Sequence, residues 1–599
     1  MTRNSSMARV KLLILLIPTF LLVALPDAAT GQIPSNVSPI IRMKKEEIQA
    51  QAISRRATRS FGAPALSNRL VKVDEAGNIH TYIRVYSFGS AERTQLEALG
   101  VNIEIVNEDY GIIQAWVPFE KIEEVAALPF VKRVTPPHYA TTMAGAVTTE
   151  GDAILRAVDV RGLGFDGTGI RVGVISDGVD NMAASQATND LPATVTVQTH
   201  AGSGDEGTAM LEIVHDLAPG AELAFCSGMT GLQMLDCVDD LANVFGADII
   251  VDDLGFFSMP FFEDGPIANA VAVVVASGVF YTSSAGNQAQ EHYQGDYVDS
   301  GDGNQSHQIS AANNIFEITD TSTVILQWSN QGGLAGDDYD ICLDTENAAT
   351  CALSNSVQDG DDLPYEARVL ACGVGTCNVQ VRLVNGNAQT LELFVLDGAL
   401  VNADDRVTAD SIFGHAAVQD VFAAAAINAG DPGNDTIASY SSRGPATIRF
   451  PATVVRQKPD VTAIDGVSIT GAGGFSNPFF GTSAAAPHVA GVAALLMSMG
   501  ASANGAAVAI KQSAVDLGAA GTDTTYGEGR IDALAAYAFI QGALQFNLQV
   551  DNNDSSDDDF CFISTAAYGS AQEPYFKAPR ELRERIMRTN YIGALSVDF

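Results

Sequence analysis

The sequence predicts an α/β protein: a parallel β-sheet with helices on both faces, preceded by an α+β domain and carrying an inserted β-sandwich. Three observations predict this class. From about Thr148, apolar strands alternate with helical segments, as in a parallel sheet covered on both faces. Before that point, the elements follow the order strand-helix-strand-strand-helix-strand of a split βαβ arrangement. Between 292 and 411, short strands separated by turns rich in Gly, Asn and Asp indicate an antiparallel sandwich.

Length, composition and charge limit the function classes. The chain has 599 residues, which predicts several domains, and 47% of them are hydrophobic, which excludes wholesale disorder. Its formal charge is -38. Because phosphate binding needs a basic face, we expect no nucleic-acid partner. The acidic residues are spread along the chain, which is typical of a protein kept in solution outside the cell.

Residues 1–31 have the pattern of a secretory signal peptide. Basic residues precede the apolar run Leu12–Leu25, and small residues follow at Ala28 and Ala29, as a signal peptidase requires. A membrane anchor is the alternative, but the run is too short to cross roughly 30 Å of hydrocarbon as a helix. We therefore expect a secreted or surface protein without a transmembrane anchor after signal removal.

The predicted α+β domain occupies 32–147. It begins with a mixed polar lead, 32–68. The predicted strands are 80–86, 101–106, 110–117 and 131–134, and the predicted helices are 90–99 and 119–128.

The predicted sheet domain spans 148–291 and 412–540, and polar residues follow its apolar strands. Asp177 follows strand 170–175, Asp253 follows 247–251, and Asn287 follows 279–282. Ligands bind at the C-terminal ends of parallel strands, so these three are candidate site residues. A turn-forming role is the common alternative for an Asp or Asn in such a place.

Ser483 lies in a small-residue turn that leads directly into an apolar helix, within Gly481–Gly491. Glycine lets a substrate approach the backbone, and the helix N-terminus places positive partial charge near the hydroxyl. The segment therefore presents a nucleophile, although an isolated turn of this kind would more simply be a serine N-cap.

The predicted insertion, 292–411, contains four of the seven cysteines. Its predicted strands are 322–329, 339–343, 366–372, 377–383 and 390–396. The pairs close in sequence are Cys226 with Cys237, Cys342 with Cys351, and Cys372 with Cys377. In an exported chain these are candidate disulfides, with buried free thiols as the alternative. Cys561 is left over, and no Cys/His spacing resembles a zinc site.

Several motifs, in order, resemble those of the subtilases, the subtilisin-like serine peptidases. The residues are Gly169–Gly178, Leu217–Ala221, Ser283–Asn287, Tyr440–Pro445, Gly481–Gly491 and Tyr526–Ala533. The resemblance implies a subtilisin-like fold in which Ser483 is the nucleophile, Asp177 supports the base and Asn287 donates to the oxyanion. It also implies that the domain before the sheet is a ferredoxin-like propeptide that blocks the cleft. Asp253 and Gly255 fall where subtilases place a Ser-Leu-Gly that walls the substrate channel.

The base departs from this pattern. Subtilases carry a histidine before a Gly-Thr pair, whereas this chain has Glu206 before Gly207 and Thr208. Glutamate at this place resembles the sedolisins, the acid-acting relatives on the same fold. A carboxylate accepts the serine proton if its pKa and the medium allow. We expect Asp177 and Glu206 to share a proton and to act at acidic pH. Alternatively, the chain is inactive and binds partners through the insertion.

Asp253 has three interpretations. It supplies the second acid that sedolisins carry one helical turn after the glutamate, where this chain has Met210; or it favours basic substrate residues; or it is a strand-end Asp facing solvent. His215 and His488 are predicted to be structural.

The sequence thus predicts a secreted bacterial serine endopeptidase acting on proteins or peptides, with its own propeptide as a partner. No cofactor is predicted, although the acidic stretch 296–304 leaves a calcium site open. An acidic linker, 541–559, is expected to lead to a C-terminal box, 560–599. The stretch Cys561–Ser570 resembles a box at the C-termini of exported bacterial proteins, with surface sorting or a packed amphipathic helix over 579–589 as alternatives.

Overall fold

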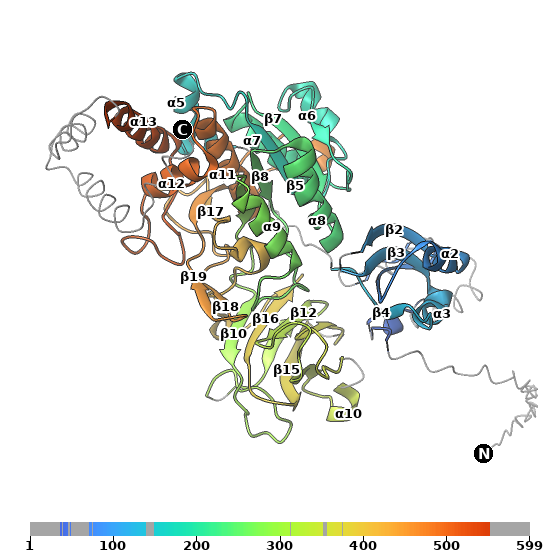
Figure 1. Ribbon diagram of the computed structural model, residues 1–599. Helices are drawn as coiled ribbons and strands as arrows, with labels where there is room; N and C mark the ends of the chain where they lie inside the picture. The colour runs from blue at the N-terminus through green and yellow to red at the C-terminus, as the bar shows by residue number, and fades with distance from the viewer. Residues whose placement is uncertain are drawn as a thin grey trace, which may run out of the picture.

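The computed structural model describes residues 36–38, 40–45, 48, 71–74, 76–108, 110–138, 149–311, 313–351, 356–373 and 375–550 (Figure 1). The predicted signal peptide, the acidic stretch 551–559 and the C-terminal box with Cys561 lie outside the described residues.

A seven-stranded sheet forms the centre of the molecule, in the order β20-β17-β9-β8-β5-β7-β6 (Figure 1). Every neighbouring pair is parallel. Its strands are β5 (Arg171–Ser176), β6 (Thr196–Val197), β7 (Glu222–Ser227), β8 (Ile249–Asp252), β9 (Phe280–Ser284), β17 (Phe422–Asn428) and β20 (Val461–Asp465). The predicted parallel sheet is confirmed.

Helices cover both faces of this sheet because its strands are apolar on both sides. Along β8, Ile249 and Val251 join one apolar cluster, while Ile250 joins the other. The first cluster includes α7 (Glu206–Leu217) and α11 (Thr482–Met497), and the second includes α8 (Gly231–Asp239) and α9 (Pro266–Ala276). The remaining elements of the domain are α4 (Gly151–Ile154), α5 (Ala157–Gly162), α6 (Met182–Thr188), β18 (Ala446–Ile448), β19 (Val454–Arg456), α12 (Ala503–Ser513) and α13 (Ala533–Val550).

The predicted end of the sheet domain, at 540, falls inside helix α13. Helix α13 continues to Val550, so the predicted linker 541–559 begins inside a helix. The segment before the acidic run is rich in Ala, Leu and Phe and holds no proline, so nothing in it stops a helix. Within the described part of the chain, no helix is long and apolar enough to cross a membrane.

The N-terminal domain is a four-stranded antiparallel sheet in the order β2-β3-β1-β4, with two helices packed on it. Its elements are β1 (Asn78–Val85), α2 (Ser90–Ala98), β2 (Asn102–Asn107), β3 (Ile112–Pro118), α3 (Ile122–Ala126) and β4 (Val131–Thr135). The sheet lies beside α8 in Figure 1. There the backbone N–H of Leu232 donates to the Tyr82 hydroxyl at 3.1 Å, and the Thr230 hydroxyl donates to Gln114 Oε1 at 2.8 Å.

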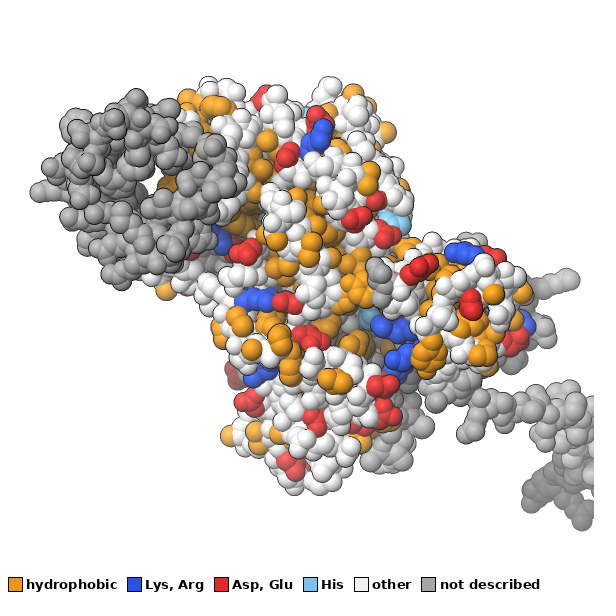
Figure 2. Space-filling model, viewed as in Figure 1, with side chains coloured by type: hydrophobic (Ala, Val, Ile, Leu, Met, Phe, Trp, Pro, Cys, Tyr) orange, Lys and Arg blue, Asp and Glu red, His pale blue; other side chains and the backbone are white. Residues whose placement is uncertain are grey.

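The same domain also touches the insertion, through an ion pair between Arg133 and Asp362. Figure 2 shows Lys and Arg side chains gathered at this junction. The N-terminal domain is therefore docked on two separate parts of the chain.

The insertion consists of two antiparallel sheets, β10-β16-β12-β14 and β11-β15-β13, around one apolar core. Its elements are β10 (His292–Asp296), β11 (Phe316–Thr319), β12 (Thr323–Trp328), β13 (Asp338–Leu343), α10 (Ala348–Cys351), β14 (Tyr365–Val369), β15 (Thr376–Asn385) and β16 (Thr390–Leu396). β10 and β11 were not predicted, because both strands are too short to show a clear alternation of polar and apolar residues beside the acidic turn between them.

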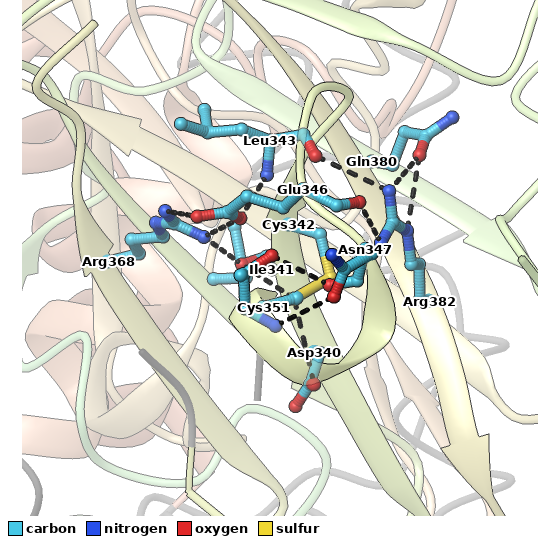
Figure 3. The surroundings of a disulfide bond; sticks show 11 residues. Asp340, Ile341, Cys342, Leu343, Glu346, Asn347, Cys351, Arg368, Gln380 and Arg382 are labelled. Carbon is cyan, nitrogen blue, oxygen red and sulfur yellow. Dashed lines mark hydrogen bonds and ion pairs between the residues drawn. A yellow bond between two sulfur atoms is a disulfide. The ribbon is translucent and has the colours of Figure 1, made fainter. Parts of the chain in front are cut away.

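The three predicted disulfides are present: Cys226–Cys237, Cys342–Cys351 and Cys372–Cys377. Figure 3 shows the second of these, which closes a loop after β13. Arg368 donates two hydrogen bonds to Glu346 inside that loop, at 2.8 and 2.7 Å. Arg382 reaches the backbone oxygen of Glu346 at 2.9 Å. The loop is thus fixed by a covalent bond and by ionic hydrogen bonds together.

Candidate active site

The candidate residues lie at one edge of the sheet because three adjacent strands end beside them. In the order β9-β8-β5, the chain leaves the sheet toward Asn287, Asp253 and Asp177 respectively. Helices α7 and α11, which begin at Glu206 and Thr482, pack against each other over this sheet. Parallel strands therefore place residues distant in sequence at a common edge, where sites in open α/β sheets are found.

Ser483 occupies the first turn of α11. Gly481 precedes the helix with a φ of 103°, a backbone conformation that favours glycine. Ser483 is buried, and its hydroxyl has no hydrogen-bond partner among the described residues. The structure therefore places the serine at a helix N-terminus, but it does not join the hydroxyl to Glu206 by a hydrogen bond.

Asn287 is tied to the turn that carries the serine. Its Oδ1 accepts hydrogen bonds from the Thr482 backbone N–H and from the Thr482 hydroxyl, both at 3.0 Å. Because a backbone N–H only donates, the side-chain oxygen must face Thr482, and this fixes the direction of the amide nitrogen. The predicted oxyanion donor, Asn287, is thus hydrogen-bonded to Thr482, the residue directly before the predicted nucleophile Ser483.

Asp177 binds the first turn of α7. Its Oδ1 accepts the backbone N–H groups of Gly178, Glu206 (3.0 Å) and Gly207 (3.2 Å). Burial raises the pKa of Asp177 to about 6, although these three donors oppose the shift. A side chain at Gly207 would strike Phe225, since a Cβ there would lie 2.2 Å from the ring. By accepting the backbone N–H groups of Glu206 and Gly207, Asp177 fixes the start of α7 and so orients Glu206.

Glu206 and Asp253 face each other in the interior. Asp253 has 0% of its surface exposed and Glu206 has 1%, so the interpretation of Asp253 as a solvent-facing residue is wrong. Burial raises the pKa of Asp253 well above its ordinary value, and the neighbouring Glu206 raises it further. Sequence reasoning missed this burial because Asp253 follows the last residue of the strand, where exposure is usual.

Asp465, at the end of β20, is a site residue that sequence reasoning missed. Its Oδ2 accepts the backbone N–H of Gly481 at 2.9 Å and the hydroxyl of Tyr440. Burial raises the pKa of Asp465 to about 6. The signal that could have found it is the one that found Asp177: an Asp that directly follows an apolar strand.

No histidine replaces Glu206. All eight histidines of the chain are described, and none hydrogen-bonds Ser483. His488 lies in α11, but its Nδ1 is bonded to the Ala484 carbonyl at 2.7 Å. His415 and Ser283 both bond Oδ1 of Asp252, at 2.8 and 2.9 Å. His215 lies half-buried in α7. The only group at the start of α7 that could accept a proton is therefore a carboxylate.

The remaining predicted sites are less defined. Gly255 lines a cavity of about 20 Å³, room for roughly one water molecule, and its place in a substrate channel stays a prediction. In the acidic stretch 296–304, Asp299 and Asp302 accept backbone N–H groups of the turn, at 2.9 and 2.8 Å. Within the described residues, the clusters of three potential metal ligands all lie outside this stretch.

Comparison with known proteins is consistent with this geometry. The subtilase family model matches residues 193–529, more than half of the chain, which includes Glu206 and Ser483 but begins after Asp177. A subtilisin-like protease, SBT4.12 of Arabidopsis thaliana, is 28% identical over 411 residues, covering 59% of this chain and 53% of that protein. The chain thus spans about half the length of this curated relative. A solved structure, the CspB protease of Clostridium perfringens, matches at 13% identity and a TM-score of 0.46, over 65% of this chain and 97% of that one.

Proposed function

The chain belongs to the subtilase family, and from this premise we propose that it is a serine endopeptidase with a Ser-Glu-Asp centre that acts at acidic pH. The observation that carries the proposal is the bond between Asn287 and Thr482, which holds an amide donor beside Ser483. A nucleophile and an oxyanion donor held as one unit are the parts that peptide hydrolysis needs.

The reaction follows from the residues. Ser483 Oγ attacks the peptide carbonyl while the Glu206 carboxylate takes its proton. The oxyanion that forms is held by the Ser483 backbone N–H and the Asn287 amide. As the C–N bond breaks, Glu206 returns the proton to the leaving amine, which produces an acyl-enzyme. Water then attacks the ester, Glu206 again moves the proton, and the acid product leaves with Ser483 restored.

The acidic optimum follows from the identity of the base. A carboxylate accepts protons most effectively when its pKa is near the pH of the medium. Asp177, whose pKa is raised to about 6, then contributes by orienting Glu206. We also propose that the N-terminal domain is a propeptide and that the chain is exported through its predicted signal.

The test is covalent labelling of Ser483 with a fluorophosphonate at low and neutral pH. We expect labelling of the propeptide-free protein in the acidic range, and none in Ser483→Ala. Labelling that rises only above neutral pH would contradict activity at acidic pH, but it would still support a serine peptidase. Full activity of Glu206→Gln would remove Glu206 from the mechanism.

A second candidate is an inactive protein of the same fold that binds partners through its insertion. The buried Ser483 hydroxyl, with no hydrogen bond to Glu206, favours it. Absence of labelling at every pH would support this alternative.

A further inference from the structure

We propose that Asp253 is the residue that shares a proton with Glu206, so that the base of this site is a buried carboxyl–carboxylate pair and not a Glu206–Asp177 pair. The inference deepens the proposed function and rests on it. It assigns to Asp253 the part of a positioning residue: Asp253 acts on the substrate only through Glu206.

The partners of Asp177 argue against it as the shared carboxyl. Its Oδ1 is occupied by three backbone N–H groups at the start of α7. Its other oxygen, Oδ2, lies against Gly204, where a Cβ would approach to 1.9 Å. These backbone donors favour the anionic form of Asp177 and oppose the rise that burial causes in its pKa, so above its pKa of about 6 Asp177 is an anion with donors of its own.

The surroundings of Asp253 are the opposite. Both of its carboxyl oxygens are buried without a regular hydrogen bond among the described residues. Two ionised carboxylates only accept, so Asp253 and Glu206, which interact in the interior, can form a hydrogen bond only when one of them carries a proton. An isolated buried anion without donors is costly, and protonation removes that cost.

The groups around the pair supply no positive charge. At the end of β5, Ser176 approaches Asp253 without a regular hydrogen bond, and the following residue, Asp177, lies close enough to oppose its ionisation. α7 contributes Glu206. Beside Asp253 in the chain, Asp252 is engaged with His415 and Ser283. The charged groups that act on Asp253 are therefore acidic, and each of them favours its protonated form.

The pair has a defined task in the reaction. A protonated Asp253 donates to the Glu206 carboxylate and keeps it ionised at a pH where a lone buried glutamate would be protonated. Glu206 then accepts the Ser483 proton while Asp253 keeps its own. Above the second ionisation both carboxyls would be charged, and this would oppose the negative charge developing on the oxyanion. The pair therefore predicts a bell-shaped dependence of kcat/KM on pH.

The proton itself is measured by infrared spectroscopy on the full chain carrying Ser483→Ala, so that no self-cleavage occurs. We expect that at neutral pH, above the pKa of about 6 of Asp177, Asp253→Asn removes one protonated-carboxyl C=O band and Asp177→Asn leaves that band in place. Glu392→Gln is the matched control: Glu392 is a buried carboxyl of the insertion whose pKa is raised to about 8, so its own band must disappear. If Asp177→Asn removes the band and Asp253→Asn does not, the inference is overturned.

The pH profile of the active enzyme gives the second readout. Asp253→Asn keeps a donor to Glu206 but cannot ionise, so the alkaline limb of kcat/KM should disappear. Asp253→Leu removes the donor, so the acid limb should move up by about one pH unit, equal to a tenfold loss at that limb. Profiles that superimpose on the unmodified enzyme in both variants would overturn the inference. If the protein proves inactive, the infrared bands still decide where the proton lies.

Discussion

Two carboxyls, Asp253 at the sheet edge and Glu346 in the insertion, differ in what surrounds them. In the insertion, Glu346 accepts two hydrogen bonds from Arg368, and this arginine holds the pKa of Glu346 below its ordinary value (Figure 3). At the sheet edge, Asp253 faces Glu206, and its pKa is raised. Asp253 is fully buried and its partner is a second acid, whereas Glu346 is only partly buried and its partner is a cation.

The comparison teaches which buried acids are structural. A carboxylate bound by Arg is ionised at all ordinary pH values and stabilises the fold, because the charges satisfy each other. A carboxyl that faces another carboxyl holds a proton it can lose, and it costs stability when it does. Of these two carboxyls, Asp253 is therefore the one suited to proton chemistry, and the Glu346–Arg368 ion pair stabilises the fold of the insertion.

The largest expected effect is on kcat/KM, and it distinguishes the sheet edge from the insertion. Glu206→Gln should lower kcat/KM by about 10²–10⁴, since the amide cannot accept the serine proton. Glu346→Gln should leave the rate unchanged and lower the free energy of unfolding by about 2 kcal/mol, because Arg368 loses its charged partner. Initial rates on a quenched peptide, together with urea unfolding, measure both. Equal rate losses in the two variants would break the comparison.

A smaller loss of rate is expected at Asn287. Asn287→Ala should lower kcat by about 10²–10³ and leave KM nearly unchanged, because the amide acts mainly on the oxyanion. The control is Asn387→Ala in the insertion, whose side chain donates to Asp337 at 3.1 Å. That variant should keep the full rate. If Asn287→Ala changes KM but not kcat, the proposed role of Asn287 as an oxyanion donor is contradicted.

The smallest expected effect is on stability as a function of pH. The pKa of Asp177 is raised to about 6 from 3.8, so between these values the folded protein holds a proton that the unfolded chain has lost. The free energy of unfolding should therefore fall as pH rises from about 4 to about 6. Asp177 contributes about 2 kcal/mol to this fall, once the screening of a partly exposed carboxyl is allowed for.

Asp177→Asn should remove the part of this fall in the free energy of unfolding that Asp177 contributes. Glu346 has the opposite sign: its lowered pKa contributes stability that is present above the ordinary glutamate pKa and is lost as pH falls toward the folded value. Urea unfolding between pH 3 and pH 8 (roughly the range both titrations cover), in a Ser483→Ala background, measures the two slopes. The same slope in Asp177→Asn as in the parent would contradict the raised pKa.

Much of the fold could be predicted from local sequence. Apolar runs such as 170–175 and 279–282 match strands β5 and β9 to within about two residues at each end, because strands buried on both faces need continuous apolar residues. The disulfides were predictable because each pair of cysteines is close in the chain. Ser483, Glu206 and Asn287 could be singled out because the motifs around them resemble those of the subtilases.

What the sequence alone determined, then, is the parallel sheet, the insertion within it and the identity of the residues at the strand ends. Only the tertiary structure decided which of those residues meet. Because β8 lies between β9 and β5, Asp253 is brought to Glu206, although the two residues are far apart in the sequence. The helices that cover the sheet then exclude water from both carboxyls. Strand order and burial are properties of the whole packed chain, and they turned an ordinary strand-end Asp into a partner of the base.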